Sequence, residues 1–491
     1  MAKVYIIGAG PGDTELLTVK AQRVLGKCTA VLYDRLVGGN ILKYLNDDCE
    51  IYYCGKEPGC HYKTQDEINS MIVELAKKGH VVGRIKGGDP YVFGRGGEEV
   101  LSLLEENIQF EVIPGITSAI SVLSYAGIPV THRAISQSFH IITGMSSVSS
   151  KVNWEALGKI DGTLIFLMGV ENIGTISSNL IKYGKDENTP CGIVRRGTTA
   201  NQRKLITTLK DAERMIKEEN FKSPCIIVVG DVVQFNDKFN WYEKKELFGT
   251  NLCITRPKGL GDSLSEKIKD LGGEVTEIPA IEIKKTPEVL DDILDKLNTY
   301  DYIVLTSINA VNIFFNYLVQ KNIDIRTIKA DFAVIGNATE AVLKKRGIIS
   351  KIKGKDFTGE GLLNALYPEI NKNHRILIPC SLSSRTLLRD ELEKRAMEVN
   401  CKYIYEPIIP KRINNRAFDD VNVVLYTSPS IVNNMIKIFG LESLKKKQSI
   451  AIGPITQKVL ENNGIDSIIC DRPEEQAIIN TLINFGRNTK C

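Results

Sequence analysis

The chain has 491 residues, more than one hydrophobic core usually organises, so two or more domains are expected. Its composition, 43% hydrophobic and 25% charged, is that of an average soluble α/β protein. The formal net charge is only +4, and Lys and Arg are spread along the whole length, which argues against binding to nucleic acid.

The apolar runs and the cysteines indicate the compartment. The sequence holds no apolar stretch long enough for a signal peptide or a membrane span, so we expect a cytoplasmic protein with no membrane partner. The eleven cysteines include no C-x-x-C pair, and Cys49, Cys54 and Cys60 with His61 lack the spacing of a zinc site. In a reducing compartment cysteines usually serve as small buried residues, so we expect neither disulfides nor a metal.

The first predicted strand, residues 3–7, leads into the turn GAGPGD at residues 8–13, and Asp34 follows the next strand. This is the order of a nucleotide-binding βαβ unit. Two residues argue against NAD: Asp13 replaces the third glycine, and Pro11 stiffens the turn where backbone N–H groups would approach a pyrophosphate. The turn by itself leaves a nucleotide-like cofactor and a structural tight turn both open.

A second glycine-dense loop, RIKGGDPYVFGRGGEE at residues 84–99, lies between a predicted strand and a predicted helix. Its glycines allow the backbone to approach a ligand closely. Asp89 places a carboxylate beside that ligand, which suits a cationic, hydroxyl-bearing molecule better than a polyphosphate. Taken together, the two loops favour a cofactor site over an ordinary mobile loop.

Apolar β-branched runs alternate with helical patterns throughout, which is typical of α/β proteins. A polar stretch at residues 234–249 separates two halves and is expected to be a linker. The second half contains a diverged internal repeat whose segments recur in the same order. The paired segments are Thr255-Arg256 with Ser384-Arg385, Thr306-Ser307 with Thr427-Ser428, Ile335-Gly336 with Ile452-Gly453, and residues 359–363 with 474–478. This repeat predicts two like α/β subdomains with a ligand cleft between them.

The second half is poor in catalytic residues. It has one histidine, His374, and neither a Ser/His/Asp arrangement nor a phosphate loop. Ser and Thr recur after strands and before helices, where they ordinarily cap the helix. A capped helix N-terminus also offers N–H donors to anionic groups, so capping and ligand binding are compatible.

The first half resembles uroporphyrinogen-III C-methyltransferase over residues 1–245. The resemblance rests on the two glycine loops and on residues 33–35, 55–56, 114–119, 125–133 and 167–169. It implies the tetrapyrrole methyltransferase fold, two α/β domains with the cofactor between them, and a homodimer through this half. Leu123 and Met145 depart from the family pattern.

This resemblance implies a set of functional residues. Asp34 is the implied proton acceptor and Lys56 the implied donor, and a base is needed because methyl transfer to a pyrrole carbon must be followed by loss of a proton. The substrate carries eight carboxylates, so we hypothesise that Arg35, His132 and Arg133 form part of a cationic ring around it. The residues implied to bind S-adenosylmethionine are Pro11, Gly87, Gly88, Asp89, Val92, Thr117, Ser118, Met168 and Gly197.

The second half resembles uroporphyrinogen-III synthase, on the Thr306-Ser307, Thr427-Ser428, residues 452–456 and Tyr405 segments. The resemblance implies a two-lobed α/β fold with lobes at residues 249–283 plus 407–491 and at 284–406. It implies no metal or organic cofactor. Tyr405 is a candidate to assist departure of water during ring closure, and a structural role for its phenol is an equal alternative. The implied substrate-binding residues are Thr306, Ser307, Thr427, Ser428 and Thr456.

Together the two resemblances predict a bifunctional enzyme. Residues 249–491 would cyclise hydroxymethylbilane to uroporphyrinogen-III with inversion of ring D, and residues 1–245 would methylate that product twice with S-adenosylmethionine to give precorrin-2. An alternative keeps the methyltransferase and treats the second half as a non-catalytic tetrapyrrole-binding module. A third, an NAD-linked oxidoreductase, conflicts with Pro11 and Asp13. Precorrin-2 leads to siroheme and to cobalamin, and the sequence leaves both destinations open.

Overall fold

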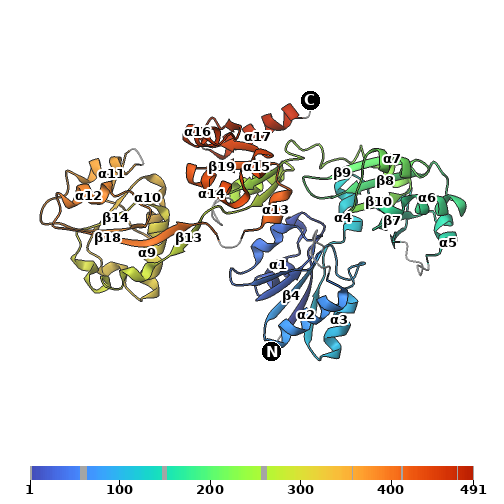
Figure 1. Cartoon of the computed structure of the whole chain (residues 1–491), viewed down its shortest axis with the longest axis horizontal. Helices are drawn as coiled ribbons and strands as arrows, with labels where there is room; N and C mark the ends of the chain where they lie inside the picture. Colours follow the sequence, from blue (N-terminus) through green and yellow to red (C-terminus); the bar gives the residue numbers. More distant parts are fainter. Residues whose placement is uncertain are drawn as a thin grey trace. The chain divides into compact units, whose positions relative to one another are not determined.

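The computed structural model describes residues 3–55, 63–145, 152–255, 262–355, 358–410, 413–472 and 474–489. These residues form four β-sheets, each covered by helices (Figure 1). The chain divides into two compact units, Met1–Ile278 with Asn414–Cys491 and Pro279–Ile413. Within the described ranges, no helix combines the length and the apolar character needed to cross a membrane. The cysteines of these ranges are mostly buried, as expected for small apolar residues.

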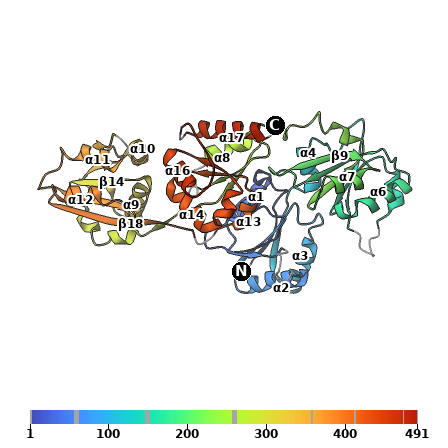
Figure 2. The same ribbon diagram turned by 45° about the horizontal axis from the view of Figure 1, so that its top comes forward.

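The first sheet is parallel and has the strand order β3-β2-β4-β1-β5. Its strands are β1 (Lys3–Gly8), β2 (Ala30–Tyr33), β3 (Glu50–Tyr53), β4 (Val81–Lys86) and β5 (Gln109–Ile113). Helices cover both faces, as a parallel sheet requires: α1 (Val19–Leu25) lies on one, and α2 (Gln65–Lys77) and α3 (Gly96–Glu105) lie on the other (Figure 2). All five strands therefore end at the same edge of the sheet.

The second sheet is mixed, with the order β6-β7-β10-β8-β9. Its strands are β6 (Phe139–Thr143), β7 (Thr163–Leu167), β8 (Pro190–Arg195), β9 (Arg203–Thr208) and β10 (Cys225–Val229). Strand β10 is antiparallel to both β7 and β8, and β6 is parallel to β7, so the carboxyl ends of β6, β7 and β8 share one edge. Its helices are α4 (Ser118–Tyr125) on one face and α5 (Trp154–Lys159), α6 (Ile173–Lys182) and α7 (Ala212–Glu218) on the other.

Residues 234–249 are packed, in contrast to the expected linker. The rings of Trp241 and Tyr242 lie 4.9 and 4.7 Å from the ring of Tyr125 at the end of α4. Leu247 is fully buried, and its N–H donates to the carbonyl of Leu271 at 2.9 Å. The few apolar side chains of this stretch therefore hold it in place. The free energy gained by burying them outweighs the preference of the polar residues around them for solvent.

The third sheet is parallel and has the order β12-β11-β19-β20-β21. Its strands are β11 (Asn251–Ile254), β12 (Glu274–Glu277), β19 (Val423–Tyr426), β20 (Gln448–Ala451) and β21 (Ser467–Ile469). Its helices are α8 (Asp262–Asp270), α13 (Asn415–Asp419), α14 (Pro429–Phe439), α15 (Leu441–Lys445), α16 (Pro454–Asn462) and α17 (Glu475–Thr489).

The fourth sheet makes up the second unit and has the order β13-β18-β17-β14-β15-β16, with β13 alone antiparallel to its neighbour. Its strands are β13 (Glu282–Lys285), β14 (Tyr302–Leu305), β15 (Asp331–Val334), β16 (Ile352–Lys353), β17 (Arg375–Ser381) and β18 (Glu398–Ile408). Its helices are α9 (Ile308–Gln320) on one face, α11 (Gly359–Leu366) and α12 (Leu387–Glu393) on the other, and α10 (Asn337–Lys344). Because β13 pairs with the end of β18, residues 282–283 and 407–408 belong to this sheet instead of lying outside residues 284–406.

The internal repeat predicted from the sequence is confirmed by the order of strands in these two sheets. The series β11-β19-β20-β21 in the third sheet has the same places as β17-β14-β15-β16 in the fourth. Thr427-Ser428 follows β19 just as Thr306-Ser307 follows β14, and each pair precedes a helix. The chain leaves the third sheet after β12 and returns to it before β19. The third sheet is therefore interrupted along the sequence by the whole second unit.

Candidate functional site

The two glycine loops of the first half meet at the carboxyl edge of the first sheet. Gly10 N donates to Gly88 O at 3.2 Å, and Gly88 N donates to Gly10 O at 2.7 Å. Both glycines have positive φ, +73° and +68°, a conformation that L side chains rarely adopt. A parallel sheet ordinarily binds its ligand outside the carboxyl ends of its strands, and this pairing assembles such a site.

A third loop, which follows β5, touches the other two at Gly115, where backbone atoms approach closely. A Cβ on Gly115 would overlap the carbonyl oxygen of Gly88. Asp89 ties the loops together, because Oδ1 accepts from Tyr91 N at 2.9 Å and Oδ2 accepts from Gly115 N at 3.0 Å. The Asp89 carboxylate, expected beside a ligand, thus also braces the turn. Thr117 caps α4 through Ala119 N, so the helix begins at this edge with Ser118.

The loop after β8 reaches the first glycine turn. Asp13 N donates to the buried Thr198 Oγ1 at 3.2 Å, which brings Pro11 and Gly197 to neighbouring turns. Met168 follows β7 at the same edge of the second sheet as Gly197 follows β8. Val92 packs against the apolar cluster under α4. The structure therefore gathers the expected cofactor residues on the loops of two sheet edges.

Backbone strain is concentrated in the same loops. Met168 has a φ of +58° and is 45% exposed. Arg196 and Thr198, on either side of Gly197, have φ values of +46° and +68°. Residues with side chains pay an energetic cost in this conformation, of order 1–3 kcal/mol each, and such strain clusters at ligand sites. The pattern singles out Arg196 and Thr198, which the sequence motifs do not mark.

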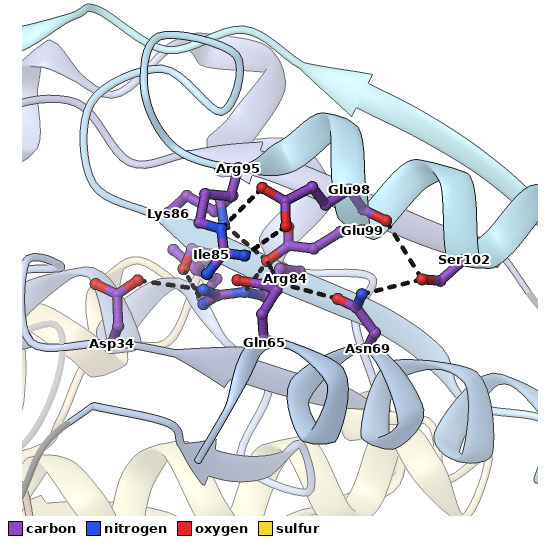
Figure 3. A network of polar contacts seen from close by, with 10 residues as sticks. All are labelled: Asp34, Gln65, Asn69, Arg84, Ile85, Lys86, Arg95, Glu98, Glu99 and Ser102. Carbon is purple, nitrogen blue, oxygen red and sulfur yellow. Dashed lines mark hydrogen bonds and ion pairs between the residues drawn. The ribbon is translucent and has the colours of Figure 1, made fainter. Parts of the chain in front are cut away.

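Asp34 lies at the end of β2, beside the second glycine loop. Its Oδ1 accepts from Leu36 N at 3.0 Å and its Oδ2 accepts from Arg84 Nη2 at 3.3 Å (Figure 3). A Cβ on Gly87 would come within 2.9 Å of the Leu36 Cβ, so the Asp34 turn and the cofactor loop are in contact. Lys56, the expected proton donor, lies outside the described residues.

Behind Asp34 is a buried group of charges that the sequence reading missed. Arg84 and Lys86 point to the same face of β4 and are 3% and 4% exposed. Both contact Oε1 of Glu99 on α3, at 2.9 Å from Arg84 Nε and 2.7 Å from Lys86 Nζ (Figure 3). Burial lowers the pKa of Lys86, and Arg84 acts in the same direction while Glu99 opposes it. The signal in the sequence was two cations at alternate positions of an otherwise apolar strand.

The three residues hypothesised to bind substrate carboxylates do not lie in one place. Arg35 is exposed and follows Asp34. His132 stacks on Phe235 at 4.8 Å, and Ser136 of the same turn bonds Thr163 at the amino end of β7. His132 and its neighbour Arg133 thus lie at the opposite edge of the second sheet from Met168 and Gly197. The structure does not bring these two residues together with Asp34.

In the second half, Ser307 and Tyr405 form a polar pair in a cavity of about 370 Å³. Ser307 Oγ and Tyr405 OH are 2.8 Å apart, and Ser307 Oγ also accepts from Ala310 N at 3.0 Å as the cap of α9. Burial raises the pKa of Tyr405, against the opposing effect of its hydrogen bond to Ser307. Thr306 lines the cavity, as do Arg385 and Arg389, to which the sequence reading gave no role.

The remaining predicted substrate residues belong to the third sheet. Ser428 caps α14 by accepting from Ile431 N at 3.4 Å, and its hydroxyl bonds Ser430 at 2.9 Å. Thr427 precedes it and is half-buried. Thr456 is buried in the first turn of α16. Thr427 and Ser428 occupy the same places after β19 as Thr306 and Ser307 do after β14.

Two family models match the chain. Residues 3–213 match Tetrapyrrole (Corrin/Porphyrin) Methylases, and residues 262–480 match Uroporphyrinogen-III synthase HemD. The porphyrin biosynthesis protein HemD of Ruminiclostridium josui is 35% identical over 497 residues, which cover 98% of each chain.

Two shorter relatives match the first half alone. The uroporphyrinogen-III C-methyltransferase of Priestia megaterium is 46% identical over 48% of this chain and 100% of its own. The S-adenosyl-L-methionine-dependent uroporphyrinogen III methyltransferase of Methanosarcina barkeri is 48% identical over 48% of this chain and 93% of its own. The two halves thus match different family models, and one relative spans both.

Proposed function

The chain belongs to the porphyrin biosynthesis family in which a tetrapyrrole methylase and a uroporphyrinogen-III synthase are joined, and from this premise we propose that it catalyses two consecutive reactions. The second half closes hydroxymethylbilane to uroporphyrinogen-III with inversion of ring D. The first half methylates that product twice and yields precorrin-2. The predicted fold class and both predicted resemblances are confirmed by the family matches.

The observation that carries the methyltransferase proposal is the backbone pairing of Gly10 with Gly88 beside Asp34. The side-chain-free backbone of these loops, the Asp89 carboxylate and the strained Met168 fit a cationic, hydroxyl-bearing ligand such as S-adenosylmethionine. When bound, this group supplies an electrophilic methyl. The residues that would hold it are Pro11, Gly87, Gly88, Asp89, Val92, Thr117, Ser118, Met168 and Gly197.

Asp34 acts as the base in this proposal. Once a pyrrole carbon has gained a methyl, the macrocycle carries a positive charge and must lose a proton from another of its atoms, and a carboxylate at the mouth of the site can accept that proton. Asp34 is held at both oxygens, by Leu36 N and by Arg84, so its position is defined before the substrate arrives. We assign the proton-donor role to Lys56. Arg35, His132 and Arg133 remain candidates for binding the substrate's carboxylates.

For ring closure, the arrangement of hydrogen-bond donors and acceptors around Tyr405 supports a role as a general acid. Ser307 Oγ accepts from Ala310 N and can donate its own proton to the Tyr405 oxygen. The phenolic proton is then free to point into the cavity that Tyr405 lines. A tyrosine is protonated at neutral pH, and burial raises the pKa of Tyr405 further. Tyr405 would donate this proton to the departing hydroxyl, and the residues that would bind substrate are Thr306, Ser307, Thr427, Ser428 and Thr456.

The second half is therefore a synthase and not only a binding module, and we propose that it needs no metal or organic cofactor. We further propose that residues 1–245 and 249–491 are the two functional parts. The predicted lobes of the latter were 249–283 plus 407–491 and 284–406, and the pairing of β13 with β18 moves residues 282–283 and 407–408 into the second lobe. Homodimerisation through the first half and a cytoplasmic location remain predictions.

A coupled assay tests the proposal. The whole chain receives hydroxymethylbilane with and without S-adenosylmethionine, and the isomer and methyl count of the product are read. We expect the type III isomer without the methyl donor and a dimethylated product with it. A buffer control measures the spontaneous type I isomer. If only type I accumulates, the second half is a binding module, and if type III stays unmethylated, the methyltransferase assignment is wrong.

A further inference from the structure

Arg84 is the residue through which the buried charges reach the surface of the site. It extends from β4, the strand that lies directly beside β2 in the first sheet, and Leu32 pairs with Arg84 in that register. Asp34 is the second residue after Leu32, on the loop that follows β2. The side chain of Arg84 is 4% exposed, whereas that of Asp34 is 27% exposed. One end of the ion pair is therefore in the core and the other is partly exposed, and Figure 3 shows the contact between them.

All three nitrogens of the Arg84 guanidinium are engaged. Nε donates to Glu99 Oε1 at 2.9 Å, Nη1 donates to the Ile85 carbonyl at 2.9 Å, and Nη2 donates to Asp34 Oδ2 at 3.3 Å. Two of these bonds are to groups inside the protein, so they fix the plane of the guanidinium. The third then has only one direction in which to point, which is toward Asp34.

Glu99 is held in turn by several donors. Its Oε1 accepts from Lys86 Nζ at 2.7 Å and from Gln65 Nε2 at 3.3 Å, in addition to Arg84. Among the described residues, its other oxygen, Oε2, has no hydrogen-bond partner. Burying a carboxylate that has one oxygen without a hydrogen-bond partner costs desolvation free energy. Such a cost is retained where the charge has another role. Here it anchors the cation that holds Asp34.

We propose that Arg84 is a positioning residue for methyl transfer, which acts by holding the Asp34 carboxylate at the end of β2. The inference rests on the proposed role of Asp34 as the base. Arg84 need not touch substrate or cofactor. A guanidinium is required because a lysine ammonium on a flexible chain cannot serve Glu99, the Ile85 carbonyl and Asp34 in one plane.

The test is a double-mutant cycle in the full chain, with R84M, D34A and the double variant assayed for methyl transfer from S-adenosylmethionine to uroporphyrinogen-III. We expect R84M to lower kcat by roughly 10- to 100-fold, the range that a misplaced catalytic group produces. The KM values for both substrates should change by less than about threefold, since binding contacts are intact. In the D34A background, R84M should have no further effect on kcat.

Two controls separate positioning from folding. K86M removes the other cation on Glu99, from the same strand and at the same depth, but not the hydrogen bond to Asp34, so its kcat should stay within about threefold of the wild type. Binding of S-adenosylmethionine, measured by calorimetry on the same preparations, reports whether the first half of each variant is folded. R84K should behave like R84M.

Three results would overturn the proposal: an unchanged kcat in R84M, an equal loss when R84M is added to D34A, or a loss in K86M as large as in R84M. The proposed function fails separately, if the wild type does not methylate uroporphyrinogen-III or if D34A retains full activity.

Discussion

Ser307 and Tyr405 join two elements that lie 98 residues apart in the chain, with their hydroxyl oxygens at 2.8 Å. Ser307 caps α9, which follows β14, and Tyr405 is near the end of β18. Because β18 lies two places from β14 in the fourth sheet, the pair links the start of α9 to a strand that does not neighbour β14. The phenol is 7% exposed but lines the cavity. A buried tyrosine with a defined partner and one face on a cavity is suited to donate a proton.

Replacing Tyr405 by phenylalanine should slow formation of uroporphyrinogen-III about 100-fold, the lower end of what general acid catalysis contributes. Hydroxymethylbilane that escapes closure would cyclise spontaneously, so the share of type I isomer should rise. The matched control is Y302F, a buried tyrosine at the opposite end of β14 from Thr306, which should keep the wild-type rate. A Y405F enzyme with an undiminished rate would leave the phenol with a structural role only.

The contact between the loops after β4 and β5 gives a second prediction. In G115A the new Cβ meets the Gly88 carbonyl, so the two loops must separate, at a cost of about 1–3 kcal/mol in stability. S-adenosylmethionine binding, measured by calorimetry on the whole chain, should weaken at least tenfold, because the cradle is distorted.

The control for this substitution is G97A. A Cβ on Gly97 meets no atom within 4 Å, and the residue lies in α3 of the same domain. G97A should therefore bind the methyl donor as the wild type does. Equal binding by G115A and G97A would mean that the Gly88–Gly115 contact does not shape the site.

Asp34 supplies a third prediction. D34N keeps the size of the side chain and an oxygen that can accept from Arg84, but it removes the basic carboxylate. Methyl transfer should fall about 100-fold or more, while binding of S-adenosylmethionine, measured by calorimetry, stays within about twofold. The retained binding of S-adenosylmethionine also serves as the control for folding of the first half. Near-normal methylation by D34N would transfer the role of base to another residue.

Local patterns predicted much of this site, and long-range pairing explains what they left out. The glycine loops and Asp34 follow strands within a few residues, so spacing predicts their place at the sheet edge, while their roles are implied by the family resemblance. The Arg84–Asp34 ion pair depends on β4 lying beside β2, a sheet order that spacing does not reveal. Arg385 was recognised as a repeat position, but its place on the Tyr405 cavity depends on how β17, β14 and β18 align.

The direction of β7 decides where two of the expected substrate-binding residues lie. His132 and Arg133 were grouped with Arg35 because a cationic ring suits a substrate with eight carboxylates. The turn that holds them lies at the amino end of β7, where Ser136 bonds Thr163. Nothing in a list of charges tells which end of a strand a loop will occupy, so chemical type alone could not place them.

Glu274 gives a prediction about pH. Its carboxylate accepts from Ala200 N at 3.2 Å and from Asn40 Nδ2 at 3.4 Å, and burial raises its pKa to about 7. The folded protein therefore holds this proton more tightly than the unfolded chain. The stability that comes from protonated Glu274 is complete below the unfolded-state pKa and is lost as the pH rises through about 7.

Replacing Glu274 by glutamine keeps a neutral acceptor at every pH. E274Q should thus unfold at nearly the wild-type temperature at pH 5.5 and should be more stable than the wild type at pH 8, by about 1–3 kcal/mol. Glu277 in the same strand provides the control, since it forms a partly exposed ion pair with Lys43 at 2.9 Å. E277Q should lose a little stability and gain nothing at pH 8. An advantage of E274Q that is equal at both pH values would show that titration of Glu274 is not the cause, because a pH-independent gain can come only from packing or hydrogen bonding.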